Sequence, residues 1–243
     1  MELRKLISIF AVSLAISACG GGGSSDSGSS SVSASAADGI YFGSGNEDGF
    51  GGFEILGFVD RGQLYAISDT GVGYTGTLNL QNENDYSTSL TLYDVDYARF
   101  DSASMSGNYT PDDSISGTYT RASGPKGSFS IDYLPEVYGR PVSTDLISGT
   151  WDVTNATTTT TITFDTNGNI TGQNTDGCVY SGSISVPDES VNMFRVSLLI
   201  ESCGQSNGSY QGLAAIMSSN SNSNIIAFMS NSSTGFALDL SKQ

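Results

Sequence analysis

Two aspartates that lie close together in the sequence could act as a catalytic pair. Asp94 and Asp96 alternate with Tyr93 and Tyr97, so on a β-strand both carboxylates would project from the same face. Paired carboxylates hydrolyse glycosides when they are about 5–10 Å apart and titrate differently. A solvated acidic face accounts for these residues more simply, as it does for the acidic, glycine-rich loop 46–52. A carboxylate-dependent glycosidase is therefore only a distant alternative.

A second acidic segment could supply oxygen ligands to a metal ion. Asp165, Asn167 and Asn169 alternate like the first ligands of a calcium-binding loop. Ile170 stands at the sixth position, where such a loop needs glycine, and the twelfth position holds aspartate instead of glutamate. Because Asn-Gly pairs such as Asn167-Gly168 favour tight hairpin turns, we expect a turn here and no metal site.

The composition excludes several classes of protein. The chain has 243 residues, with 9 lysines and arginines, 25 aspartates and glutamates, no histidine and a formal net charge of −16. Without histidine, neither a Ser-His-Asp triad nor a histidine metal site can form. A chain this acidic is unsuited to nucleic acid, whose phosphates need a basic face. We therefore predict a non-enzymatic protein with no cofactor and no nucleic-acid partner.

The first 18 residues have the features of an export signal. Arg4 and Lys5 give it a basic start. The apolar run Leu6–Ile16 that follows has 11 residues, which is too short to span a bilayer and typical of a signal-peptide core. Residues 1–18 are thus expected to be removed from the mature protein.

The residues that end this signal resemble a bacterial lipobox. They read Ile16-Ser17-Ala18-Cys19, and an ordinary secretory signal with an incidental cysteine is the alternative. The resemblance implies acylation of Cys19, with the acyl chains as the membrane partner. It also implies the outer membrane, on its periplasmic or surface face, because Gly20 follows the cysteine. Residues 19–38 are rich in glycine and serine and predict a flexible tether with a span of about 25 Å.

From residue 39 onward the pattern is that of β-structure. Short alternating apolar runs are separated by Gly, Asn, Asp and Ser, and no helical apolar face is sustained. We predict two tandem antiparallel β units, each a small barrel or sandwich, at 39–133 and 149–240, with a linker at 134–148. One larger barrel made from both halves is the alternative. The predicted strands are 39–43, 52–59, 62–68, 74–80, 87–93, 96–101, 115–121 and 127–133, with a long loop over 102–114, and then 149–155, 159–165, 168–173, 178–186, 192–201, 208–217, 224–230 and 234–240.

An internal repeat supports the division into two units. Residues 71–80 match residues 177–186 at an offset of 106, and the turns that end in Gly62 and Gly168 keep the same offset. The units also open alike, as Gly39-Ile40-Tyr41 and Gly149-Thr150-Trp151, and the segments 116–119 and 207–210 are similar.

Cys178 and Cys203 flank a predicted hairpin in the second unit. An antiparallel register in which paired residue numbers sum to 381 places them opposite one another, within reach of a disulfide. Export would expose both thiols to an oxidising compartment. A reactive pair or a metal site is the alternative, but the sequence offers no histidine or further cysteine as ligands. We therefore predict a structural disulfide.

Several motifs resemble a family of bacterial secreted or lipid-anchored β proteins. They are Gly149-Thr150-Trp151, the Gly-Cys-x-Tyr-x-Gly strand at 177–182, Asn192-x-Phe194-x-Val196 and Cys203. The resemblance spans about 39–240 and implies fold and location, without catalytic residues.

These features predict a lipid-anchored outer-membrane protein that binds an unidentified partner without catalysis. A lipocalin-like carrier of a small apolar ligand is the alternative. The size of the inward-facing side chains separates the two, since small residues leave a cavity and large ones fill it. We expect most of the 12 tyrosines, and Trp151, to belong to the core.

Overall fold

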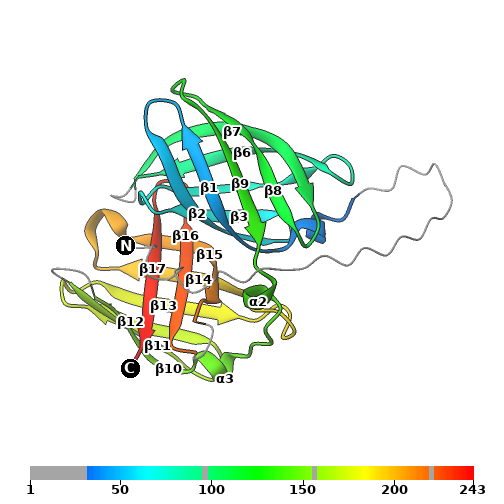
Figure 1. The fold of residues 1–243 in the computed structure, drawn as a ribbon. Coiled ribbons are helices and arrows are strands. Elements are labelled where there is room, and N and C mark those ends of the chain that lie inside the picture. The colour runs from blue at the N-terminus through cyan, green and yellow to red at the C-terminus, as the bar shows by residue number, and fades with distance from the viewer. Residues whose placement is uncertain (1–31, 95–97, 155–157, 219–221) are drawn as a thin grey trace.

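The structure is a computed structural model that describes residues 32–94, 98–154, 158–218 and 222–243. It contains two closed antiparallel β-barrels of eight strands each, stacked against one another with the short helix α2 at their junction (Figure 1). The prediction of two tandem barrel-like units is confirmed, and the alternative of one larger barrel is wrong.

Barrel 1 is formed by the first nine strands. Its ring runs β4-β3-β2-β1-β9-β8-β7-β6 and closes where β4 pairs with β6, while the short β5 continues along β6. The strands are β1 (Gly39–Glu47), β2 (Gly51–Asp60), β3 (Gln63–Ser68), β4 (Gly73–Thr77), β5 (Asn79–Leu80), β6 (Asp85–Tyr93), β7 (Arg99–Thr110), β8 (Ser114–Arg121) and β9 (Lys126–Tyr133).

Barrel 2 is an up-and-down ring in sequence order, closed by pairing between its first and last strands. The strands are β10 (Gly149–Thr154), β11 (Thr159–Phe164), β12 (Asn169–Asn174), β13 (Val179–Ser185), β14 (Phe194–Glu201), β15 (Gly208–Ile216), β16 (Asn224–Ser230) and β17 (Gly235–Lys242). Between β14 and β15 lies the 3-10 turn η2 (Gly204–Ser206).

The predicted loop over 102–114 is wrong, because most of it is strand β7. Ala103, Met105 and Tyr109 of β7 are buried in the barrel, whereas the serines at 104 and 106 face out. Buried and exposed residues therefore alternate as in any half-buried strand. The exposed positions hold small hydroxyl side chains, which made the sequence resemble that of a loop.

The repeat found in the sequence holds for the fourth strands of the two barrels. β4 and β13 carry the matching segments, and the preceding turns contain Gly62 with φ +76° and Gly168 with φ +80°. In each turn the glycine carbonyl accepts a hydrogen bond from the fourth-strand region, from Leu78 N (2.8 Å) and from Ile184 N (2.7 Å). The match between 116–119 and 207–210 is wrong as an equivalence, because β8 is the seventh strand of its ring and β15 the sixth.

A short helical turn precedes and caps each barrel. The 3-10 turn η1 (Ala34–Ala37) precedes β1, and α3 (Thr144–Ile147) precedes β10. Tyr41 Oη donates to Ala37 O (3.0 Å), and Trp151 Nε1 donates to Ile147 O (2.7 Å), four residues back in both cases. Both aromatic rings are fully buried, as predicted for Trp151. Residues 34–38 thus lie against barrel 1, at the end of the segment predicted as tether.

A third apolar cluster joins the two barrels. It combines outward-facing side chains of β1, β2 and β3 with those of β15 and β16, and includes Phe58 and Leu213. Val137 of α2 (Pro135–Tyr138), in the segment predicted as linker, is buried in the same cluster. At its edge Arg195 Nε and Nη2 bind Asp60 Oδ2 and Oδ1 at 2.5 and 2.9 Å. The barrels are therefore packed together and not merely tethered.

The predicted disulfide between Cys178 and Cys203 is present, with 4.6 Å between the Cα atoms. The predicted register is wrong by one residue, because Glu201 lies opposite Val179 and not Tyr180. Ser202 takes a left-handed conformation, φ +58°, after β14 ends. This turn of the backbone brings Cys203 back to Cys178 and compensates for the shift.

Residues 1–18 and Cys19 lie outside the described residues, as does the tether up to residue 31. Across the part of the chain that is described, none of the helices has the length and apolar character needed to cross a membrane.

Candidate binding site at the mouth of barrel 1

The two ends of barrel 1 differ. One end is covered by η1, whose Ala34 lies beside the β2–β3 turn at Gly62. The other end is ringed by the connections β1–β2, β3–β4 and β8–β9 and by the adjoining ends of β6 and β7. A pocket of about 300 Å³ opens there, and we call it the mouth. Its wall includes Glu47, Phe50, Phe53, Tyr74, Phe100 and Arg121.

A buried group of charges forms one wall of the mouth. Arg121 Nη1 binds Glu47 Oε1 at 2.6 Å, and Arg121 Nε binds Asp101 Oδ2 at 3.0 Å. Tyr119 Oη donates to the second oxygen of Glu47 at 2.8 Å. The side chains of Arg121, Glu47 and Asp101 are only 12%, 8% and 7% exposed. Buried charges are tolerated when they are paired and hydrogen-bonded in this way.

The pKa values of these groups follow from their contacts. A hydrogen bond from Ser123, together with others from the backbone and Arg121, lowers the pKa of Asp101. Burial, and then the hydrogen bond to Glu47, raises the pKa of Tyr119. Burial lowers the pKa of Arg121, but its bonds to Asp101 and Glu47 outweigh this and raise it overall. These shifts hold Asp101 and Arg121 in their ionised forms, with Tyr119 as a neutral donor.

The sheet register brings these distant residues together. Glu47 ends β1 and lies opposite Gly127 on β9, and Arg121 ends β8, the next strand of the ring. On the other side of β8, Arg121 lies opposite Ala103 of β7, two residues beyond Asp101. All three charges therefore arrive at the same rim from adjacent strands.

Two phenylalanines project at the rim of the mouth. Phe50 lies at the tip of the β1–β2 hairpin and is 75% exposed, and Phe100 of β7 is 42% exposed. Gly49 and Gly51 flank Phe50 with φ +84° and +89°, a conformation that other residues adopt with strain. The Arg121 guanidinium lies 5.8 Å from the centre of the Phe50 ring and 4.9 Å from that of Phe100. The rim thus offers exposed aromatic surface around a fixed cation.

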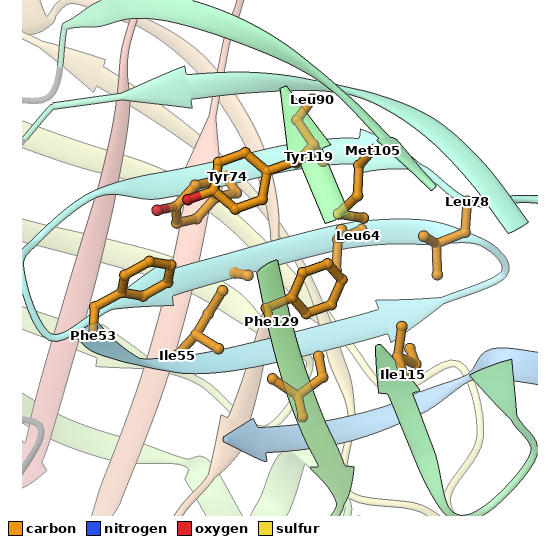
Figure 2. Close-up of a pocket in the computed structure, with 12 residues that line it drawn as sticks. Phe53, Ile55, Leu64, Tyr74, Leu78, Leu90, Met105, Ile115, Tyr119 and Phe129 are labelled. Carbon is orange, nitrogen blue, oxygen red and sulfur yellow. The ribbon is translucent and has the colours of Figure 1, made fainter. Parts of the chain in front are cut away.

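Below the mouth, barrel 1 is filled by large side chains. Figure 2 shows Phe53, Tyr74, Tyr119 and Phe129 pointing into the interior from four strands. Phe53 and Tyr74 line both the mouth and the interior cavity, which has a volume of about 40 Å³. The corresponding cavity of barrel 2 has about 20 Å³. Each holds on the order of one water molecule, far below the roughly 300 Å³ that an ordinary ligand needs.

The acidic residues that the sequence offered as catalytic or metal-binding candidates lie in separate parts of the structure or outside the described residues. Asp94 is exposed at the mouth, while Asp96 lies outside the described residues. Asp165 Oδ1 accepts hydrogen bonds from the backbone N of Asn167 and of Asn169, both at 2.8 Å, which confirms the predicted turn. Hydrogen bonds from Asn169 lower the pKa of Asp165. Over the described ranges, no three or more Asp, Glu, His or Cys residues cluster as metal ligands.

Most tyrosines belong to the core, as predicted, with Tyr41, Tyr86 and Tyr210 among the fully buried side chains. Sequence reasoning missed the charge group of Glu47, Asp101 and Arg121, because nothing in the sequence links residues 74 positions apart. The signal that could have identified the mouth is the single phenylalanine between glycines in the acidic loop 46–52.

Comparison of the chain with known protein families, with curated proteins and with solved structures finds no significant match. Function is therefore inferred from the mouth of barrel 1 and from the N-terminal sequence.

Proposed function

We propose that this chain is a lipid-anchored outer-membrane protein that binds a partner at the mouth of barrel 1 without catalysis. The observation that carries the proposal is the pair of exposed phenylalanines, Phe50 and Phe100, beside a pocket of about 300 Å³. Exposed aromatic side chains at a rigid rim are typical of surfaces that bind a partner.

The direction of the mouth supports this role. The N-terminal segment joins barrel 1 at the end covered by η1, where Asp38 Oδ1 accepts a hydrogen bond from Arg61 N at 2.6 Å. The mouth lies at the opposite end of the barrel. A protein anchored through acyl chains on Cys19 would therefore present the mouth away from its attachment point.

The chemistry of the mouth supports binding more than catalysis. Glu47 and Asp101 both bind Arg121, so neither carboxylate is held as a free acid or base. The chain also lacks the histidine that most often acts as a general base.

The filled interiors favour this proposal over the lipocalin-like carrier. A carrier keeps its ligand inside the barrel, and the interior cavities here have about 40 and 20 Å³. Of the two interior cavities and the mouth, only the mouth, with about 300 Å³, has room for a side chain or small molecule.

The anchor is tested by Cys19→Ala. We expect wild-type protein in the outer-membrane fraction and the variant released from it. Membrane retention of the variant would refute the anchor.

Binding is tested by native mass spectrometry of the membrane-extracted protein from its own host. We expect a bound partner on wild type and on Leu199→Ser, which changes an exposed apolar residue of barrel 2. The Phe50→Ser variant should lose that partner. Equal occupancy in Phe50→Ser and wild type would contradict binding at the mouth, and mass attributable to a small apolar molecule would favour the carrier.

A further inference from the structure

We infer that the partner of the mouth is a basic peptide segment that carries large apolar side chains. This inference rests on the proposed function and names the chemistry of the partner. It combines two properties of the rim, its aromatic surface and its excess of negative charge.

The apolar part of the segment has a place in the mouth. Val72 and Leu92 join Phe53, Phe50 and Phe100 as apolar wall, and the pocket of about 300 Å³ holds one leucine- or phenylalanine-sized side chain. Phe50 and Phe100 are exposed without such a side chain, and its insertion would remove their apolar surface from water.

The net negative charge of the rim favours a positively charged partner. Five described acids lie in its connections and strand ends, against three bases. They are Glu47, Asp48, Asp69, Asp94 and Asp101, against Arg99, Arg121 and Lys126. Since Arg121 is bound to two of the acids, the buried group itself is negative by one charge. The whole chain has a formal net charge of −16, which attracts cations over a longer range.

The aromatic rings can accept a cation as well as an apolar group. Arg121 already places a guanidinium 4.9 Å from the centre of Phe100, and its charge is offset by Glu47 and Asp101. A lysine or arginine of the partner can therefore lie over the outer face of Phe50, near Asp48. An acidic partner would meet the same rim with repulsion.

The test measures peptide binding to the full lipoprotein reconstituted in zwitterionic vesicles, with empty vesicles as the blank. Three fluorescein-labelled peptides of equal length are compared by anisotropy: alternating Lys and Leu, alternating Glu and Leu, and alternating Lys and Ser. We expect the Lys-Leu peptide to bind at least 10-fold more tightly than either of the others, and its binding to weaken as salt is raised.

Variants locate the site. Phe50→Ser changes a hairpin tip and should leave the melting temperature unchanged while weakening Lys-Leu binding at least 10-fold. Asp48→Asn should weaken it severalfold. Leu199→Ser and Glu201→Gln, the matched changes on barrel 2, should leave it as in wild type.

Equal binding of the Lys-Leu and Glu-Leu peptides, or unchanged binding in Phe50→Ser, would overturn the inference. Failure of the inference is distinguishable from failure of the proposed function. If the native partner depends on Phe50 but the Lys-Leu peptide does not bind, the mouth is a binding site and the partner chemistry is wrong. If Phe50→Ser binds the native partner as well as wild type does, the proposed function itself fails.

Discussion

Tyr119 Oη donates a hydrogen bond of 2.8 Å to Glu47 Oε2, and this bond connects the interior of barrel 1 to its mouth. The ring of Tyr119 lines the apolar cavity, whereas the carboxylate of Glu47 holds Arg121 at the rim. The shape of the binding surface therefore depends on the packing of the barrel beneath it.

Tyr119→Phe should destabilise the protein. It removes the donor and leaves one oxygen of a buried carboxylate without its partner, which costs about 1–3 kcal/mol of unfolding free energy. Urea denaturation measures the loss. Tyr133→Phe is the control, since the hydroxyl of Tyr133 has no hydrogen-bond partner among the described residues. Equal effects of the two changes would show that the bond to Glu47 contributes nothing.

Removal of the disulfide should lower the melting temperature. Cys178 and Cys203 are 25 residues apart, and closing a loop of this length contributes about 3 kcal/mol in the chain-entropy model. Cys178→Ala, Cys203→Ala and the double variant should therefore melt alike and below wild type. Chemical reduction should lower wild type to the same point. Alkylation of two free thiols in the native protein would disprove the bond.

Asp38 should make stability fall as the pH rises from about 4 to about 6. Burial raises its pKa to about 6, above the value of about 4 in an unfolded chain. In this window the folded state binds the proton more tightly, so deprotonation favours unfolding. Asp38→Asn keeps the oxygen that accepts from Arg61 N. It should match wild type near pH 4 and exceed it at pH 7 by about 1 kcal/mol, after allowance for solvent screening.

Asp188 is the matched control for that pH profile. Hydrogen bonds from Ser190 lower its pKa, so its contribution has the opposite sign and is lost as the pH falls. Asp188→Asn should therefore be no more stable than wild type at pH 7. A stabilising effect of both changes would point to general charge reduction and not to burial of Asp38.

The two barrels should unfold together. The chain has a single tryptophan, Trp151, buried in barrel 2, so its fluorescence reports that barrel alone, whereas circular dichroism reports both. The apolar cluster between the barrels couples them, and the two probes should give coincident transitions in wild type. Leu213→Ala, which opens a cavity in that cluster, should separate them. Separate transitions in wild type would show that the interface does not couple the barrels.

The sequence allowed the barrels to be predicted more fully than the interface between them. Alternating apolar residues located most strands, and turns such as Asn167-Gly168 located their ends. The apolar run 225–229 is buried on both faces of β16, one in barrel 2 and the other against barrel 1. A continuous apolar run indicates a strand that is buried on both faces, but it does not show which part of the protein covers the second face.

Other features depend on backbone geometry or long-range register. The left-handed Ser202 compensates for the one-residue register shift at the disulfide, and a serine gives no sequence signal for that conformation. The mouth requires the β1–β9 and β8–β9 registers, which bring Glu47 to Arg121. The one sequence signal that could have indicated the site, Phe50 between Gly49 and Gly51, was missed.

The central claim is that the mouth of barrel 1 binds the partner and the end covered by η1 does not. Photo-cross-linking in intact host cells tests it most directly, with a photoreactive phenylalanine analogue at Phe50 or at Asp113, which is exposed in the β7–β8 turn at the covered end. We predict a covalent adduct of defined mass from position 50 and none from position 113. An adduct from position 113, with or without one from position 50, would contradict the account, and so would the absence of an adduct from both positions.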